Sequence, residues 1–376
     1  MSGHIRRRGK NSFELKFDIG TDQATGKRRL RYHSFKGTKA QANIKLAELI
    51  VAAGKGSYVD SSKVTVAAHV RARIDQWEAA PGGITARTAQ RYRQLCENQI
   101  VPHLGAKPMQ KLAKSDIEQW HNVLHQGGLA ARTIGHAHRV LSKALGDAES
   151  DGLVVKNVCQ LRKAPKVAKR TMVIVQDVPD FLAKIQGSRM YVHAVLALVG
   201  GLRLGEVLAL RDRCVDLENR VIKVREALEE TKAHGVRFKA PKSEAGCRDV
   251  TLPDIAVEAL REHRKRLLEI RMKLGAGKLP AAALLFSNLE GLPLRPSAIS
   301  SDWGEIAESI GMPEITFHAL RHTHASQLID RSVDIVTIAT RLGHGKPSVT
   351  LAIYAHMFKT DDRKAAAAID AALGVP

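Results

Sequence analysis

The hydrophobic pattern changes along the chain, and the order of these changes constrains the fold more than any other feature. Apolar and polar residues alternate over residues 13–19 and 29–35, as in strands with one buried face. Residues 64–152 instead carry apolar residues at helical spacing. Beyond residue 171, helical segments surround short alternating runs. The sequence therefore predicts a multidomain, mainly α protein with a small β-sheet plus helix, an α-helical bundle and an α+β domain.

Breaks between these patterns set the domain boundaries. Thr38 is suited to cap a helix that continues to about residue 53 and is ended by Gly54 and Gly56. A basic stretch around Pro165 separates the bundle from the last domain, and an ordinary solvated linker explains it as well as a strap along a polyanion does. The predicted segments are an N-terminal domain, a helical domain, a basic linker and a third domain that ends in an alanine-rich helix, at residues 1–56, 62–155, 156–170 and 171–376.

Four helices are predicted in the second segment. The first is broken at Pro81-Gly82-Gly83, and Thr85 opens the second. A turn is expected over residues 102–105, where a proline and a glycine lie close together. Ser115 is expected to cap the third helix, and the fourth spans residues 130–151.

In the third segment, a helix over residues 192–199 is expected to end at Gly200-Gly201. Alternating runs predict strands over residues 221–224, 236–240 and 248–252. Residues 242–246 are interpreted as the turn of a hairpin between the last two strands.

The net charge of +21, from 59 Lys+Arg against 38 Asp+Glu, predicts a polyanionic partner. Nucleic acid is favoured over an anionic membrane surface, since no apolar run approaches the length of a bilayer span and the N-terminus does not resemble a secretory signal. The cysteines are isolated and form no Cys-x-x-Cys pair, which favours reduced thiols in the cytoplasm over a zinc site or disulfide framework. They are Cys96, Cys159, Cys214 and Cys247.

Scattered residues in the second half of the chain form one chemical inventory of two guanidiniums, an ammonium, two imidazoles and a phenol. They are Arg203, Lys242, His318, Arg321, His344 and Tyr354, with Glu206 as a supporting carboxylate. A tyrosine has a pKa of about 10 and needs a base or a positive field to act as a nucleophile. A lone tyrosine is more often a core or surface aromatic, but the whole set suits attack of Tyr354 on a phosphodiester.

The two arginines are expected to hold the non-bridging oxygens of that phosphate, because a guanidinium stays charged and binds phosphate through paired donors. Glu206 follows Arg203 at i+3. It is either a partner in a helix-surface ion pair or a carboxylate that orients the arginine, and the two interpretations are compatible.

An ammonium on a flexible arm suits a general acid for the leaving 5′-oxygen. Lys242 at the tip of the predicted hairpin is the first candidate, and Lys232 and Lys239 remain alternatives.

His318 and Arg321 share one face of a predicted helix. His318 is expected to accept the proton of Tyr354 or to bond a phosphate oxygen, and His344 to bond the phosphate. His318 and His322 at i, i+4 could instead bind a metal, but Arg321 between them would repel a cation and no Glu follows His318. No metal or other cofactor is therefore expected.

These residues occur in distinctive local strings. They are Gly-Leu-Arg-Leu-Gly-Glu at 201–206, His-Ala-Leu-Arg-His at 318–322, Leu-Gly-His at 342–344 and Tyr-Ala-His at 354–356. In this order and spacing the chain resembles the tyrosine recombinase (phage integrase) family, and the resemblance covers nearly the whole chain. It implies an arm-type DNA-binding domain, a helical core-binding domain and a catalytic domain for the segments above.

The resemblance also implies an activity, a site-specific recombinase that integrates or excises a mobile element such as a prophage or genomic island. Tyr354 would form a 3′-phosphotyrosine link and free a 5′-hydroxyl, without ATP or metal. The family clamps double-stranded DNA at core and arm sites and works as a homotetramer on two duplexes, with a C-terminal tail docked on a neighbour. The resemblance further implies accessory DNA-bending or directionality proteins and a location on nucleoid DNA in the cytoplasm.

The N-terminal sheet would lie in the major groove of arm-site DNA, which admits a β-ribbon. Arg29, Arg31 and His33 share one face of the second strand, with Leu30 and Tyr32 on the other. The basic face is expected to contact DNA, although a generic small β-β-α module is the plain alternative.

Three other functions fit parts of the same pattern. A DNA-binding regulator with the same fold would cut nothing, and a type IB topoisomerase would use the same tyrosine chemistry to relax one duplex. An RNA-binding protein would fit the charge, but no aromatic stacking platform of the RNP kind occurs.

Overall fold

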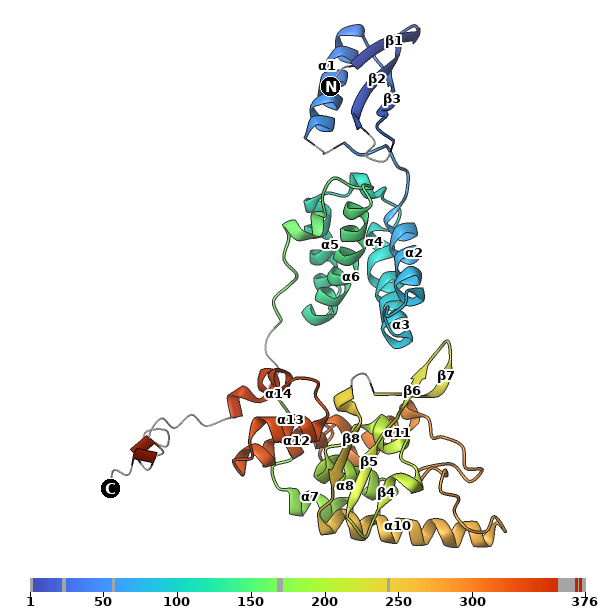
Figure 1. Ribbon diagram of the computed structural model, residues 1–376, viewed down its shortest axis with the longest axis vertical. Coiled ribbons are helices and arrows are strands. Elements are labelled where there is room, and N and C mark those ends of the chain that lie inside the picture. Colours follow the sequence, from blue (N-terminus) through green and yellow to red (C-terminus); the bar gives the residue numbers. More distant parts are fainter. Residues whose placement is uncertain are drawn as a thin grey trace. The chain divides into compact units, whose positions relative to one another are not determined.

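The computed structural model describes residues 3–21, 25–55, 58–167, 172–241, 244–357, 369–370 and 372–373. The chain divides into two compact units, Met1–Ala168 and Lys169–Pro376, coloured blue to green and green to red (Figure 1). Predicted features at residues 22–24, 56, 57 and 168–171, and most of the predicted tail helix, lie outside the described residues.

The first unit begins with a three-stranded antiparallel sheet of order β1-β2-β3, packed on helix α1. The strands are Gly3–Gly9, Ser12–Thr21 and Arg28–Lys36, and α1 spans Lys39–Gly54. Phe13, Leu15 and Phe17 alternate along β2 and are buried against α1, as the period of two predicts. Thr38 caps α1 together with Gln41, so the predicted cap is confirmed.

The predicted basic face of this sheet is not its open face. In the register, Leu15 pairs with His33 and Phe17 with Arg31, so these two basic residues share the face of the buried β2 side chains. Tyr32, 59% exposed, lies on the opposite face, across from Lys16. The alternation in the sequence is confirmed, the face that α1 covers is decided by β2, and DNA contact by the basic face stays a prediction.

A helical bundle follows, with a core of its own around Trp120, Ile117 and Leu141. Its elements are α2 (Val66–Ala79), α3 (Ala86–Leu95), η1 (Cys96–Ile100), α4 (Val101–Leu104), η2 (Met109–Lys111), α5 (Lys114–Gln126), α6 (Ala131–Ser150) and η3 (Val158–Leu161). Thr85 caps α3, as predicted.

Two predictions in the bundle are wrong. The turn expected at residues 102–105 is instead largely helix α4, which continues from α3 through the π-helical η1. Pro102 directly follows the π-helical turn, where the regular i→i−4 hydrogen bonds are already interrupted, so its missing N–H costs less than inside a regular helix. Ser115 does not cap α5; it lies inside the helix, and the carboxylate of Asp116 accepts from the backbone N–H of Ala113.

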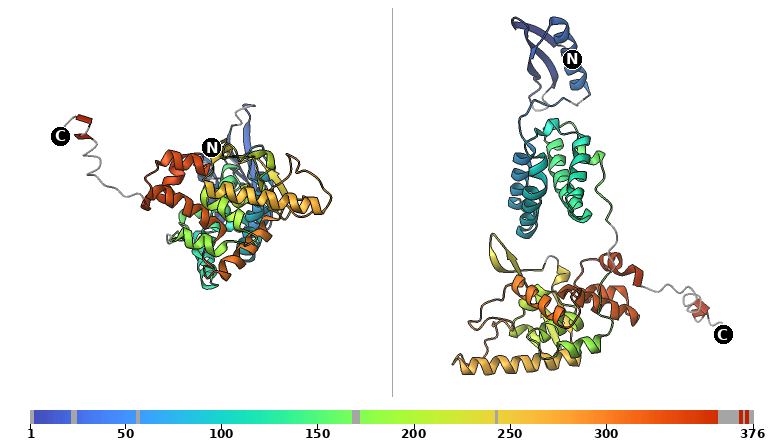
Figure 2. Two further views of the ribbon diagram at one scale, coloured as in Figure 1. Left: turned by 90° about the horizontal axis from the view of Figure 1, so that it is seen from below. Right: turned by 180° about the vertical axis from the view of Figure 1, so that it is seen from behind.

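In the second unit, α8 (Tyr191–Gly200) is almost wholly buried and packs against α10 and α12. The helices and turns around it are α7 (Val178–Ile185), α9 (Leu204–Leu208), η4 (Asp212–Cys214), η5 (Glu244–Gly246), α10 (Asp254–Lys273), α11 (Pro296–Ser309), α12 (Phe317–Asp330), α13 (Ile335–Leu342), α14 (Pro347–Tyr354) and η6 (Ala355–Met357). Helix α10 lies along one edge of the unit, away from α14 (Figure 2).

The strands of this unit form two small sheets, of order β4-β5-β8 and β6-β7. They are β4 (Val215–Asp216), β5 (Val221–Val224), β6 (Ala227–Thr231), β7 (Gly235–Lys239) and β8 (Arg248–Thr251). The predicted hairpin between residues 236–240 and 248–252 is therefore wrong, because β7 pairs with β6 and β8 pairs with β5. The register of β5 with β8 places Ile222 beside Val250 in the core, and this burial outweighs pairing between neighbours in sequence.

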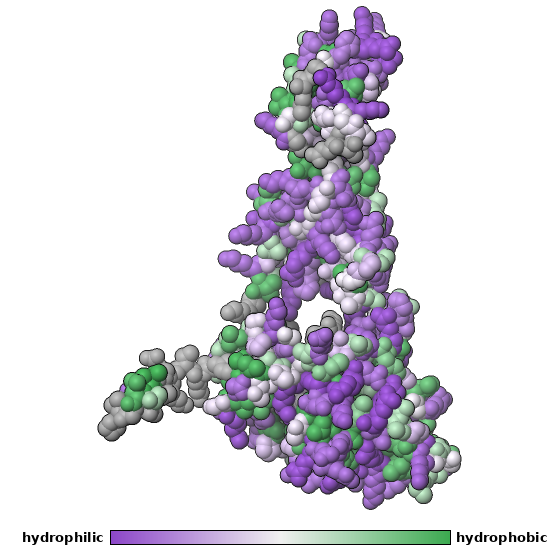
Figure 3. All heavy atoms as spheres, in the orientation of Figure 1, coloured by the Kyte–Doolittle hydropathy of each residue, from purple (hydrophilic) through white to green (hydrophobic). Residues whose placement is uncertain are grey.

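Hydrophilic side chains cover much of the face shown in Figure 3, with apolar ones scattered among them. Within the described part of the chain, none of the helices combines the length and apolar character needed to span a membrane.

Candidate active site

Arg203 is positioned by the end of helix α8. The helix stops at Gly201, whose φ of 68° is left-handed, and the chain then turns so that Arg203 forms the N-cap of α9. A Cβ on Gly201 would lie 2.7 Å from Cδ2 of His324, so the position requires glycine for both backbone and space. The side chain of Arg203 remains 39% exposed and is available to a ligand.

Glu206 holds Arg203 through two hydrogen bonds, so the ion pair is formed, but the carboxylate is buried and does not lie on the helix surface. Its Oε1 accepts from Nη1 of Arg203 at 2.7 Å, and its Oε2 accepts from the backbone N–H of Arg203 at 2.9 Å. The carboxylate is 5% exposed. Burial alone would raise the pKa of Glu206, but hydrogen bonds and charge from Arg248, and the charge of Arg203, hold it below its usual value.

Arg248 is a second partner of Glu206 that the sequence analysis did not select as a site residue. Its Nη2 donates to Oε2 of Glu206 at 2.9 Å, and its Nε donates to the carbonyl of Arg341 at 2.7 Å. The signal was present in the sequence, because Arg248 alternates with Val250 on the buried side of β8. An arginine at an inward position of a strand requires a buried partner.

Helix α12, capped by Thr316, carries Arg321 into the centre of the unit, where it is 2% exposed. Its Nη1 donates to the carbonyl of Gly201 at 2.5 Å, and its Nη2 donates to the carbonyl of Leu342 and to Nε2 of His344, the latter at 3.2 Å. Burial, followed by repulsion from Arg203, lowers the pKa of Arg321 to about 9, which leaves it charged at neutral pH.

His344 follows Gly343, which ends α13 with a φ of 65°. Because Nε2 of His344 accepts from Arg321, Nδ1 carries the proton and donates to Oγ1 of the buried Thr350 at 2.7 Å. Burial and then the charge of Arg321 lower the pKa of His344 to about 4. The ring is therefore neutral and held from both sides.

Tyr354 is the last residue of α14 and is 1% exposed. It packs in a small apolar cluster with Ala325, Ile329, Ile338 and Leu342, from α12 and α13. Burial raises the pKa of Tyr354 to about 12, and the charges of Arg321 and Arg203 oppose this rise. The phenol is therefore protonated in this structure.

The hydroxyl of Tyr354 lies 2.7 Å from Nδ1 of His322, a residue considered from the sequence only as a possible metal ligand. His318 stays exposed, and its ring contacts that of His322 edge to face at 4.6 Å between centroids. His322 is thus the described residue in contact with the Tyr354 hydroxyl, and the role expected for His318 stays a prediction. Among the residues described, no three His, Cys, Asp or Glu side chains gather as a metal-binding group.

Lys242 lies outside the described residues, so its predicted place beside the phosphate stays a prediction. The alternative Lys239 donates from Nζ to Oε1 of the buried Glu229 at 2.5 Å. This ion pair makes Lys239 a weaker candidate for the general acid.

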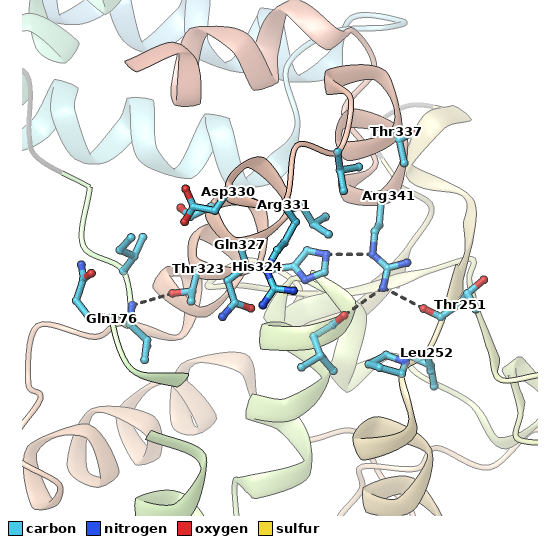
Figure 4. A pocket seen from close by; sticks show the side chains of 17 residues that line it. Gln176, Thr251, Leu252, Thr323, His324, Gln327, Asp330, Arg331, Thr337 and Arg341 are labelled. Carbon is cyan, nitrogen blue, oxygen red and sulfur yellow. Dashed lines mark hydrogen bonds between the residues drawn. The ribbon is translucent and has the colours of Figure 1, made fainter. Parts of the chain in front are cut away.

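A hollow of about 870 Å³ lies on another face of α12 and contains none of the predicted site residues that the structure describes. Figure 4 shows Arg341 within it, whose Nε donates to Nε2 of His324 while Nη2 donates to the carbonyls of Val199 and Thr251. These bonds connect α13 to α8, α12 and the end of β8, the elements that carry the site. The hollow therefore adjoins the scaffold of the site and not its chemistry.

Residues 169–361 match the phage integrase family, and residues 76–125 match the family described as phage integrase, N-terminal SAM-like domain. The chain therefore belongs to the phage integrase family and is a tyrosine-type site-specific recombinase.

Relatives extend over most of the chain. A tyrosine recombinase XerC-like protein of Caldanaerobacter subterraneus subsp. tengcongensis is 25% identical over 93% of this chain and 94% of its own length. An integrase of Streptomyces ambofaciens is 27% identical over 90% of this chain and 87% of its own length.

Two solved structures share the fold. The Tn1549 transposon integrase in complex with a circular intermediate DNA has a TM-score of 0.68 and 21% identity, and covers 82% of this chain and 99% of its own. A lambda integrase tetramer bound to a Holliday junction has a TM-score of 0.54 and 17% identity, with 92% of each chain covered.

Proposed function

We propose that this recombinase cleaves and rejoins double-stranded DNA through Tyr354, and that it integrates or excises a mobile element. The observation that carries the proposal is the convergence of Arg203, Arg321 and His344 around a phenol that is otherwise buried. Preorganised guanidinium groups of this kind stabilise the charge that develops during phosphoryl transfer.

In the proposed reaction the oxygen of Tyr354 attacks phosphorus and passes its proton to His318, the acceptor expected from the sequence, and the bond from phosphorus to the 5′-oxygen breaks. A 3′-phosphotyrosine and a free 5′-hydroxyl result. Arg203 and Arg321 bind the non-bridging oxygens, with Glu206 orienting Arg203. His344, whose Nε2 accepts from Arg321 in this structure, bonds the phosphate in the tautomer that carries the proton on Nε2. A partner strand then reverses the same steps with its own 5′-hydroxyl, so the energy of the phosphodiester is conserved without ATP or metal.

The burial of Tyr354 fits this sequence of events. Because Tyr354 is 1% exposed, DNA must displace α14 or its surroundings before attack, which keeps the nucleophile from reacting in the free protein. In this proposal Lys242 supplies the proton to the leaving 5′-oxygen. The assignment of Lys242 rests on its sequence context alone.

The DNA partner and assembly are part of the same proposal. Support comes from the Tn1549 integrase, solved with circular intermediate DNA, and from the lambda integrase tetramer on a Holliday junction. We assign arm-site binding to residues 1–56, core-site binding to 62–155, the linker to 156–170 and catalysis to 171–376, in a homotetramer on two duplexes. A cytoplasmic, nucleoid location and assistance from DNA-bending or directionality proteins complete the proposal.

The test is recovery of covalent DNA from cells. The protein is expressed in a bacterial host that carries the element, recovered under denaturing conditions, and any attached DNA is sequenced. Attachment to one short site in the wild type but not in Tyr354→Phe is the expected result. Equal amounts in both proteins would refute Tyr354 as the nucleophile and favour a protein that binds without cutting.

Relaxation of a single supercoiled duplex, with no exchange between two duplexes that each carry the recovered site, would instead favour a topoisomerase.

A further inference from the structure

His322 is the described residue that contacts the reactive atom of Tyr354. Its Nδ1 lies 2.7 Å from the phenolic oxygen, and the two rings meet edge to face with centroids 5.7 Å apart. The residues come from different elements, α12 and α14, separated by 32 positions in sequence. The contact therefore depends on how α14 docks against α12.

The direction of this hydrogen bond follows from the charges around it. Burial, and then the neighbouring His318 and Arg321, lowers the pKa of His322 to about 4, so its ring is neutral near pH 7. The phenol beside it is protonated. The hydroxyl therefore donates, Nδ1 accepts, and the ring proton of His322 is on Nε2.

A second contact, between α12 and η6 directly after α14, separates two possible roles. Oγ of Ser326, one turn beyond His322, lies 3.3 Å from Sδ of Met357 and 3.0 Å from the backbone carbonyl of His322, either of which can accept its proton. The contact with Met357 also ties the segment that carries the nucleophile to α12, but it does not touch the phenol. If His322 serves only to dock α14, the two contacts are equivalent; if it directs the hydroxyl, only His322 affects the chemistry.

We propose that His322 is a positioning residue for the nucleophile: the neutral Nδ1 accepts the hydrogen bond of the Tyr354 hydroxyl and sets the direction in which the phenolic oxygen points. The proposal rests on the proposed function, because it assumes that Tyr354 is the attacking group. It assigns to His322 a role distinct from that of Arg203, Arg321 and His344, which bind the phosphate.

Amide substitutions distinguish orientation from packing. In His322→Asn the amide oxygen occupies about the place of Nδ1 and can accept the same hydrogen bond, whereas in His322→Gln it lies one bond further out. His322→Leu keeps an apolar side chain of similar bulk and accepts nothing. The assay is single-turnover formation of the covalent complex by the full chain, on a nicked duplex that contains the site recovered above, at saturating protein.

We expect His322→Asn to cleave within about threefold of the wild type and His322→Gln and His322→Leu to be slowed about tenfold or more, the effect of one oriented hydrogen bond. DNA affinity should be unchanged in all of them, since the loss belongs to the chemical step. The matched control, Ser326→Ala, should cleave at the wild-type rate.

Four results would overturn the inference. The first is a His322→Leu protein that cleaves as fast as or faster than the wild type, and the second is a His322→Asn protein that cleaves as slowly as His322→Leu. The third is a set of cleavage rates that differ only as the DNA affinities of the variants do. The fourth is a loss of cleavage rate in Ser326→Ala equal to that in His322→Leu. If His322→Leu does not fold, the cleavage rates of His322→Asn and His322→Gln are compared instead, and equal rates would overturn the inference. Covalent complex in Tyr354→Phe would instead refute the proposed function, and the two failures are thereby distinguished.

Discussion

Replacement of Glu206 by alanine should destabilise the second unit strongly, because it leaves a buried charge without its partner. Glu206 and the side chain of Arg248 are 5% and 4% exposed, and they share hydrogen bonds of 2.9 and 3.3 Å. After Glu206→Ala, Arg248 keeps, among the described residues, carbonyl acceptors alone, those of Gly246 and Arg341. Breaking a buried ion pair by removing one partner costs about 3–5 kcal/mol, and we expect a loss of that size.

Arg203→Ala provides the contrast, since it removes the other partner of the same carboxylate. Its side chain is 39% exposed and Glu206 keeps its hydrogen bonds to Arg248, so we expect loss of this pair to cost about 0.2–1 kcal/mol, as for exposed pairs. The free energy of unfolding should therefore change little while cleavage is lost. Adding Arg248→Met to Glu206→Ala removes the stranded charge and should recover part of the stability.

The assay is hydrogen exchange of the full chain at increasing urea concentrations, read by mass spectrometry on peptides from α8, α9 and β8. Local readout is needed because the chain has two units and its unfolding is not a single transition. Equal destabilisation by Glu206→Ala and Arg203→Ala would refute the reasoning, and so would a double variant less stable than Glu206→Ala.

The pH dependence of this contribution has a definite sign. The pKa of Glu206 is lower in the folded chain than its ordinary value of 4.5, so the unfolded chain binds the proton more readily. The contribution should be complete above about pH 4.5 and disappear as the pH falls through the folded-state pKa. Glu206→Ala should show a smaller loss of stability over that range.

Three further outcomes are expected. His121 and His138 form a buried pair, with Nε2 of His121 3.1 Å from Nδ1 of His138. Burial, and then neighbouring charges that include Arg162 and Arg139, lowers the pKa of both rings, that of His121 to about 4. Protection of α5 and α6 from hydrogen exchange should therefore be complete above pH 6.5 and weaken towards pH 4. A flat profile would contradict this. Gly201→Ala should lower the protection of α8 from hydrogen exchange, through strain of about 1–3 kcal/mol and the contact with His324, and slow cleavage; wild-type values for both would contradict it. Deletion of residues 361–376 should reduce synapsis, measured by native mass spectrometry, more than DNA binding measured by gel shift, and an equal loss would argue against tail docking.

Much of the local structure was predictable because its causes are local. The alternation in β2, the caps at Thr38 and Thr85, and the end of α8 at Gly201 each depend on a few neighbouring residues. Predictions of secondary structure failed where a local sequence signal was compatible with two different structures. The proline in α4 suited a turn and equally the first turn of a helix, and only packing of the bundle decided between them.

The site shows the same division. Arg203 with Glu206, and His318 with Arg321, lie within one turn of a helix or its cap, and their relation follows from helical geometry. Arg248 and His322 were not selected, because their partners lie 42 and 32 residues away and no short motif joins them.

The sequence by itself determined which chemical groups this protein has, the order in which they occur and the elements that carry most of them, because side-chain identity and hydrophobic period act over a few residues. Tertiary structure decided which groups meet. It paired β8 with β5 instead of β7, placed Arg248 against Glu206, and set the hydroxyl of Tyr354 against His322. Such contacts depend on burial and charge compensation between distant segments, and these are properties of the packed chain alone.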